Sequence, residues 1–181
     1  MENKEISKYC LDLARKSVEN YLKEKTLIKI PQGLPDFLLN NKKGVFISIF
    51  QKNNDELRGC IGTFRATREN IAEEIIYNSL SAAFDDPRFL PLKNEELDEI
   101  YFEVFILEEP KPVKSFDELN PEIFGIIARS ENGKQALLLP NLRGITTKEE
   151  QLSAICEKAN INPEEEKISL LKFKVEKFSE Q

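Results

Sequence analysis

The segment from Leu57 to Phe64 concentrates the residue types that could do chemistry. It reads Leu-Arg-Gly-Cys-Ile-Gly-Thr-Phe, so a guanidinium, a thiol and two glycines lie close together. In a regular strand the side chains alternate, which places Arg58, Cys60 and Gly62 on one face. A guanidinium beside a thiol favours the nucleophilic thiolate form, and Gly62 would leave the sulfur accessible. The segment therefore predicts a thiolate site with Cys60 as its candidate catalytic residue.

A purely structural explanation of the same segment stays open. Glycine inside a strand usually marks a bulge or the close approach of another backbone or a ligand. Free cysteine is among the most buried residue types. Cys60 and its two neighbouring glycines could therefore be small because a helix packs against the strand.

Two further positions could add charge to such a site. Arg88 follows a proline where a helix must end, and it could bind an anion or pair with Asp85 across the turn. Glu103 lies on an otherwise apolar strand, so it must face solvent or be paired, because burial of an unpaired charge is prohibitive. Arg58 is the obvious partner for Glu103. We expect Arg58 to pair with such an internal carboxylate rather than to serve as a ligand arm.

The absence of histidine narrows the chemistry. It excludes Ser-His-Asp and Cys-His catalysis as well as imidazole-ligated metals. The base for a Cys60 nucleophile would have to be Glu103, Asp85 or a lysine, which is unusual for cysteine enzymes. Cys10, Cys60 and Cys156 are too widely spaced for a disulfide framework or a short metal-binding motif. We therefore predict no metal and no cofactor.

Composition and charge restrict the class of protein. The chain has 181 residues, 40% of them hydrophobic, with 26 Lys plus Arg against 32 Asp plus Glu, a net charge of −6. These values are typical of a globular protein. The acidic balance argues against general nucleic-acid binding, although four of the seven arginines fall between residues 58 and 88 and leave that partner open. No secretory signal or long apolar run is present, so we expect a cytoplasmic protein with reduced thiols and no membrane partner.

The elements that must position these residues follow from hydrophobic periodicity, caps and turn signals. The expected order begins with a helix over 6–21, a strand hairpin over 44–50 and 57–64, and a helix capped by Thr67 and ended by Pro87. A strand over 101–107 and a short helix at 115–118 follow. The chain then forms a hairpin over 124–129 and 134–139 around Asn132-Gly133, a helix opened by Thr147 and Glu150, and a closing strand over 168–175. Hairpins interspersed with helices predict an α+β fold with a largely antiparallel sheet.

The same residues carry a resemblance to a known family. Leu57-Arg58-Gly59-Cys60-Ile61-Gly62-Thr63 followed by Ala82-Ala83-x-x-Asp86-Pro87-Arg88-Phe89 closely resembles the AMMECR domain family. The resemblance covers nearly the whole chain, including Glu73-Glu74-Ile75-Ile76 and Leu137-Leu138-Leu139-Pro140. It is nearest to the stand-alone prokaryotic members labelled AmmeMemoRadiSam system protein A.

This resemblance implies one AMMECR-type domain over residues 1–181, with a larger lobe built from both chain ends and a smaller lobe. It implies no reaction, because the family has no established activity. The genes of such members tend to accompany a Memo-like protein and a radical S-adenosylmethionine enzyme, which are the implied partners. The chain departs from the family at Phe105, where similar chains usually have Ser, and at Lys134-Gln135-Ala136, which replaces a more Arg/Gly-rich stretch.

Three functions are compatible with these observations. The first is an enzyme or substrate-positioning subunit that uses Cys60 with Arg58 and Arg88. The second is a non-catalytic module that binds a small anion, a nucleic acid or a protein, and the third is an assembly factor for the radical enzyme. The last rests on analogy alone. The candidate catalytic residues are Cys60 and Glu103, and the candidate ligand-binding residues are Arg58, Gly59, Gly62, Thr63, Asp86 and Arg88.

Overall fold

The computed structural model describes residues 2–181 as two compact units. The larger unit contains the chain up to Leu107 together with Glu176–Gln181, and the smaller unit contains Glu108–Val175. Both chain ends therefore build the larger unit, as the resemblance implied. Each unit contains a four-stranded antiparallel sheet with helices, which confirms the α+β prediction.

The sheet of the larger unit has the strand order β2-β1-β3-β8. Its strands are β1 (Val45–Gln51), β2 (Leu57–Thr63), β3 (Ile100–Leu107) and β8 (Val175–Ser179). The β1–β2 hairpin is as predicted, with Ser48 opposite Cys60 and Phe46 opposite Gly62. Because β2 pairs only with β1 and is an edge strand, the outward backbone groups of the glycine-rich segment need partners from outside the sheet.

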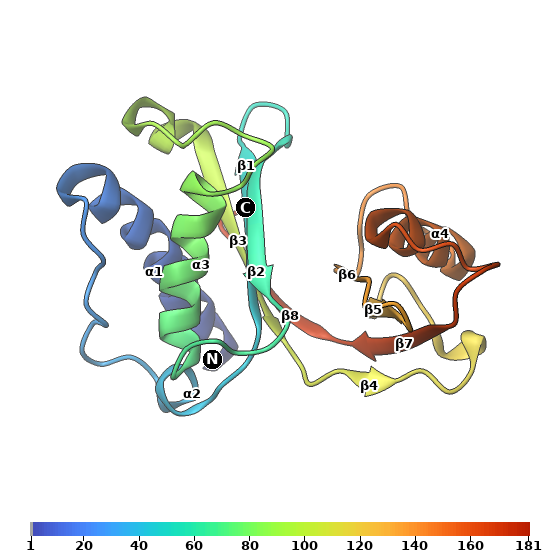
Figure 1. Cartoon of the computed structure of the whole chain (residues 1–181). Helices are drawn as coiled ribbons and strands as arrows, with labels where there is room; N and C mark the ends of the chain where they lie inside the picture. The colour runs from blue at the N-terminus through green and yellow to red at the C-terminus, as the bar shows by residue number, and fades with distance from the viewer. Residues whose placement is uncertain (1) are drawn as a thin grey trace. The chain divides into compact units, whose positions relative to one another are not determined.

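Helices α1 (Glu2–Glu24) and α3 (Ile71–Phe84) lie side by side against one face of this sheet (Figure 1). The apolar stripe of α1 is buried, with Cys10 and Ala14 fully inaccessible to solvent. It packs in one core with Ile47 and Ile49 of β1. By alternation, Ser48 and its partner Cys60 lie on the sheet face that points away from these helices.

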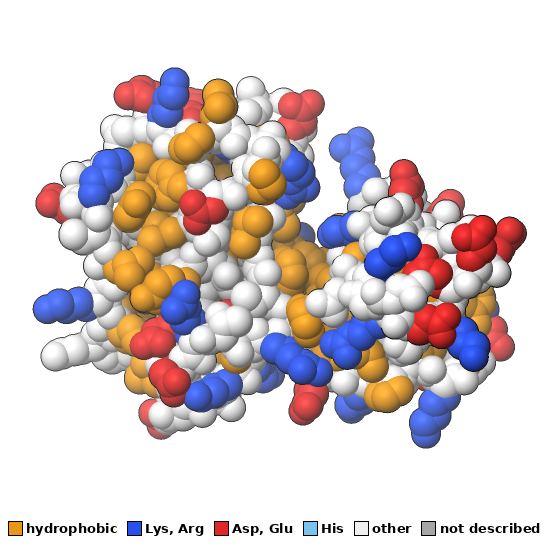
Figure 2. Space-filling model, viewed as in Figure 1, with side chains coloured by type: hydrophobic (Ala, Val, Ile, Leu, Met, Phe, Trp, Pro, Cys, Tyr) orange, Lys and Arg blue, Asp and Glu red, His pale blue; other side chains and the backbone are white. Residues whose placement is uncertain are grey.

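Short elements connect these layers. They are α2 (Asp36–Asn40) and the 3₁₀ helix η1 (Asn94–Glu99), in segments for which the sequence predicted no helix. On the face of the larger unit drawn in Figure 2, hydrophobic side chains gather over α1 and α3.

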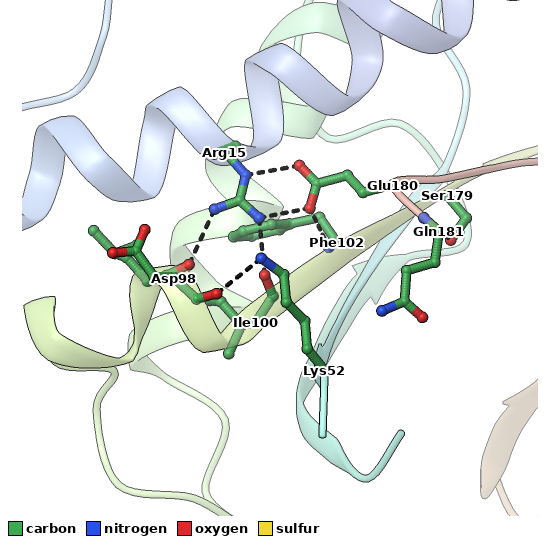
Figure 3. A network of polar contacts seen from close by, with 9 residues as sticks. Arg15, Lys52, Asp98, Ile100, Phe102, Ser179, Glu180 and Gln181 are labelled. Carbon is green, nitrogen blue, oxygen red and sulfur yellow. Dashed lines mark hydrogen bonds and ion pairs between the residues drawn. The ribbon is translucent and has the colours of Figure 1, made fainter. Parts of the chain in front are cut away.

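The last residues of the chain are attached to the larger unit by a charged network (Figure 3). Arg15 of α1 binds both carboxylate oxygens of Glu180, at 2.7 and 2.6 Å, and donates to the carbonyl of Ile100 at 2.9 Å. Its guanidinium also lies 5.1 Å from the centre of the Phe102 ring. Glu180 accepts a further bond from the Phe102 N–H at 2.8 Å. These contacts join α1, β3 and the end of β8.

The smaller unit has the strand order β4-β7-β5-β6 and one α-helix among its described residues. Its elements are β4 (Lys111–Pro112), η2 (Phe116–Glu118), β5 (Gly125–Ser130), β6 (Gln135–Leu138), α4 (Lys148–Ala159) and β7 (Ile168–Phe173). The β5–β6 hairpin around Asn132-Gly133 is confirmed, with Gly133 at φ +81°. The capping box of Thr147 and Glu150 at the start of α4 is also confirmed.

Two local predictions were wrong. The expected closing strand over 168–175 is divided, because β7 pairs with β5 in one sheet whereas β8 pairs with β3 in the other. Thr67 does not cap α3; its hydroxyl donates to Glu74, and Asn70 caps the helix by accepting from the Glu73 N–H. In both cases a partner far from the local sequence pattern determines the boundary.

No helix within residues 2–181 is both long enough and apolar enough to cross a bilayer.

Candidate functional site

A β-bulge interrupts β2 at the position where the sequence predicted regular alternation. Ile49 pairs with Gly59 and Phe50 pairs with Leu57, so Arg58 is the extra residue of β2. A bulge reorients the side chains around it. The assumption that Arg58 and Cys60 share one face of the strand is therefore wrong, because Arg58 is the bulged residue.

Arg58 is held by a carboxylate, but not by the one that we expected. Its Nε and Nη2 donate to Glu96 of η1 at 2.7 and 3.1 Å, and Nη2 also donates to the Leu90 carbonyl at 2.9 Å. The Arg58 side chain is only 10% exposed. Burial acts to raise the pKa of Glu96, but the bonds from Arg58 and from the Lys93 N–H outweigh it and lower that pKa.

Glu103 has other partners. Lys177 of β8 lies 2.7 Å from its carboxylate, and the hydroxyl of Ser179 donates to the same oxygen at 3.3 Å. The expected Arg58–Glu103 pair is therefore wrong, because β8 fills the position beside Glu103 on β3. That neighbour could not be identified without the strand order.

Cys60 differs from the other two cysteines in its exposure. Cys10 and Cys156 are buried, whereas Cys60 is partly exposed. Burial raises the pKa of Cys10 to about 12 and also raises that of Cys156. The hydroxyl of Ser48, directly across the β1–β2 pair, donates to the sulfur of Cys60 at 3.3 Å. The thiol is thus positioned by a side chain on the neighbouring strand.

An ion pair after α3 fixes the backbone of Cys60. Asp86 accepts from the Cys60 N–H at 2.8 Å, and Arg88 Nη2 donates to the Cys60 carbonyl at 3.3 Å. Arg88 and Asp86 are joined by bonds of 2.7 and 3.0 Å, so the pairing with Asp85 considered from the sequence is wrong. Asp86 and Arg88 take the place of a neighbouring strand at the edge of β2.

Arg88 binds the protein with part of its guanidinium and leaves much of its side chain exposed. Its Nε and Nη2 are used within the protein, while its side chain is 56% exposed. The Asp86 side chain is only 2% exposed. The hydrogen bond from Arg88 lowers the pKa of Asp86 to about 2, against burial and with help from the N–H groups of Cys60 and Arg88.

We expect this carboxylate to contribute stability that depends on pH. Because the folded-state pKa is depressed, the contribution is complete above the ordinary Asp pKa and is lost as the pH falls towards 2. The difference in unfolding free energy between wild type and Asp86→Asn should therefore shrink from pH ~5 to pH ~2, by about 1–2 kcal/mol after screening at the exposed arginine. Urea unfolding at both pH values measures it. An unchanged difference would contradict the role of Asp86.

The two glycines of β2 are explained by packing. A Cβ on Gly59 would overlap the carbonyl oxygen of Ala82 in α3, and a Cβ on Gly62 would overlap the Phe46 ring and the Val45 carbonyl. Gly62 therefore makes room for an aromatic side chain on β1. The helix packing left open by the sequence therefore explains Gly59, whereas Gly62 is small because of the neighbouring strand. Cys60 itself lies on the opposite face from α3.

Thr63 belongs to a buried polar cluster that the sequence reasoning missed. Its hydroxyl donates to Glu74 of α3 and accepts from the Asn78 amide at 3.3 Å. The Glu74 carboxylate, 1% exposed, also accepts from the N–H groups of Thr67 and Arg68 at 2.9 and 2.8 Å. A glutamate beside the apolar positions of a buried helix was the available signal. This cluster fixes the loop between β2 and α3.

The structure thus brings together part of the candidate site. Cys60, Asp86 and Arg88 lie in direct contact, with Ser48 added by the structure. Gly59 and Gly62 serve packing, and Arg58, Thr63 and Glu103 are bound to other partners. Among the residues that the structure describes, no three Cys, Asp or Glu side chains are grouped as a metal site would require.

Comparison with known proteins identifies a matching family and several similar chains. A sequence model of the family described as AMMECR1 matches residues 11–178. A protein from Thermotoga maritima is 37% identical over 161 residues, which cover 89% of this chain and 91% of that protein. A protein from Clostridium acetobutylicum is 41% identical over 167 residues, which cover 92% of this chain but only 34% of that relative. The chain therefore spans about a third of the Clostridium protein.

A solved structure shares the fold. The crystal structure of the uncharacterized protein PH0010 from Pyrococcus horikoshii superposes with a TM-score of 0.88 at 32% sequence identity. The match covers 98% of this chain and 92% of the archaeal one.

Proposed function

This chain belongs to the AMMECR1 family, and we propose that it acts as a binding protein whose ligand site lies at the free edge of β2 around Cys60. One observation carries the proposal: the residue that bears the partly exposed thiol accepts a hydrogen bond at its backbone carbonyl from an exposed arginine. The ion pair of Asp86 and Arg88 fixes the backbone on both sides of the thiol, so little ordering is needed when a ligand binds.

The chemistry of these groups favours an anionic ligand. Arg88 already uses Nε and Nη2 within the protein, and the exposed remainder of its guanidinium suits a carboxylate or phosphate. Binding is favoured over nucleophilic catalysis because the group bonded to the Cys60 sulfur is the Ser48 hydroxyl, whereas of the two carboxylates suggested as bases Glu103 is bound to Lys177 and Asp85 is exposed at the end of α3. A general base must lie within hydrogen-bond reach of the proton that it removes.

Alkylation rates test whether the thiol of this site is accessible. In the folded protein we expect Cys60 to react with iodoacetamide at least ~10-fold faster than Cys10 or Cys156, because those thiols react only after local opening. Peptide mapping by mass spectrometry assigns the label. Slower reaction at Cys60 than at both other cysteines would refute an accessible thiol site.

A comparison of two reagents reports on the arginine. Iodoacetate is anionic and iodoacetamide is neutral, so their rate ratio at Cys60 measures the local attraction of anions. We expect Arg88→Gln to lower this ratio roughly 2- to 10-fold, because a nearby cation concentrates anions. Arg143→Gln, in the smaller unit, is the matched charge control and should leave the ratio unchanged. An equal ratio in all three proteins would exclude Arg88 as an anion contact.

A second candidate is an assembly module for a Memo-like protein and a radical S-adenosylmethionine enzyme. Leu90 is 79% exposed in the same loop as Arg88, and it is the side chain that we propose contacts a partner protein. The match to the Clostridium relative covers only 34% of that protein, so there the matched region lies beside further sequence, as a module that works with other polypeptide segments would. Co-expression with the two partners followed by size-exclusion chromatography tests this. A complex weakened by Leu90→Asp supports it, and separate elution of all three proteins contradicts it.

A further inference from the structure

A hollow in the larger unit is lined by residues from the first turns of α1 and from the segment that leads into α2. The hollow has a volume of about 370 Å³, which is within the range of small-molecule sites. Its lining residues are Glu5, Ile6, Tyr9, Gly33, Pro35, Asp36 and Phe37. A Cβ built on Gly33 would meet no atom within 4 Å, so the backbone at this position borders open space.

The charges in this hollow are of one sign. Glu5 and Asp36 are its ionisable lining residues, and both are exposed. The ion pairs found among residues 2–181 include neither of these carboxylates. A cation could therefore bind here without first displacing a lysine or arginine from them.

The apolar part of the lining suits the same kind of ligand. Tyr9 and Phe37 contribute aromatic rings, and the face of such a ring attracts organic cations. Phe37 already shows this attraction, because the Lys43 ammonium lies 5.3 Å from the centre of its ring. Two carboxylates and two aromatic rings thus line a hollow of this size, and each of these groups favours positive charge.

We infer that this hollow binds a small organic ammonium compound, with Tyr9 and Phe37 in contact with its alkyl groups and Glu5 and Asp36 balancing its charge. A metal ion is less well matched, since it would leave the aromatic lining unused. The site is independent of Cys60 and of the proposed anion site, because the two share no residue.

Choline and its neutral isostere 3,3-dimethyl-1-butanol test the inference directly. In a titration followed by amide NMR shifts of Gly33 and Phe37, choline should bind saturably with a dissociation constant of about 1 mM. The isostere should bind about 10-fold more weakly, because it lacks the charge that the rings and carboxylates recognise. Equal binding of the two compounds, or no saturable shift at these amides with choline, would overturn the inference.

Variants locate the interaction and keep the test independent of folding defects. The double variant Glu5→Gln with Asp36→Asn should weaken choline binding about 10-fold. Asp12→Asn, elsewhere on α1 and paired with Lys16, is the matched control and should bind choline as wild type does. Lys43→Gln should instead tighten binding, because it removes the ammonium that competes for the Phe37 ring. Choline affinity that is unchanged in the double variant would place the ligand elsewhere and refute the site.

Discussion

Gly59→Ala is expected to destabilise the larger unit by about 3 kcal/mol, at the upper end of what overpacking of a core usually costs. The added methyl group would overlap the carbonyl oxygen of Ala82. That oxygen belongs to the backbone of α3, so it cannot rotate away as a side chain would. Either the helix or the bulge of β2 must shift, and both are attached to Cys60 through Asp86 and Arg88.

Urea unfolding followed by circular dichroism measures this loss, with Gly33→Ala as the control in the same unit. Gly33 has φ +81° and open space around it, so its substitution carries only the cost of a left-handed alanine, about 1–2 kcal/mol. The alkylation rate of Cys60 provides a second readout, and it should rise in Gly59→Ala because the strand edge loosens. If Gly59→Ala were no more destabilising than Gly33→Ala, the close approach of α3 to β2 would be wrong.

Elements defined by short-range signals could be predicted from the sequence, and those defined by distant contacts could not. The β5–β6 turn depends on Gly133 and the start of α4 depends on Thr147 and Glu150, all of which act within a few residues. The start of α3 instead depends on a buried glutamate that draws Thr67 into the preceding loop. The division between β7 and β8 reflects pairing with two different sheets, which periodicity along one strand does not contain.

The same distinction applies to the candidate site. The sequence indicated one strand and one helix end that contact each other in the structure, because unusual composition is visible locally. The partners were less predictable, since Asp86 lies 26 residues from Cys60 and Glu96 lies 38 residues from Arg58. The bulge at Arg58 explains why its partner was not predicted, because a bulge redirects a side chain without any change in residue type. The anion-binding and thiol roles of the site stay predictions.

Arg58→Ala is expected to lower the unfolding free energy by about 3 kcal/mol, at the low end of the range for breaking a buried ion pair. The Arg58 side chain is 10% exposed and that of Glu96 is 31% exposed, so water relieves part of the cost. The substitution removes the donors to Glu96 and to the Leu90 carbonyl at the same time. Arg58→Lys should cost about 1–2 kcal/mol, since it retains the charge but loses the planar fork.

Glu96, which binds Arg58, and Glu103, which lies on β3 with β1 between it and β2, provide the matched comparison. Glu96→Gln should cost more than Glu103→Gln, because Glu96 loses a two-bond pair with a buried arginine, whereas Glu103, itself 10% exposed, is paired with a Lys177 side chain that is 48% exposed. A double-mutant cycle between positions 58 and 96 should give a coupling energy of about 1–3 kcal/mol, against nearly zero between 58 and 103. A larger coupling to Glu103 would restore the pairing expected from the sequence. Near-silent melts for both Arg58 variants would instead show that Arg58 contributes little to the fold and would make it a candidate ligand contact beside Arg88.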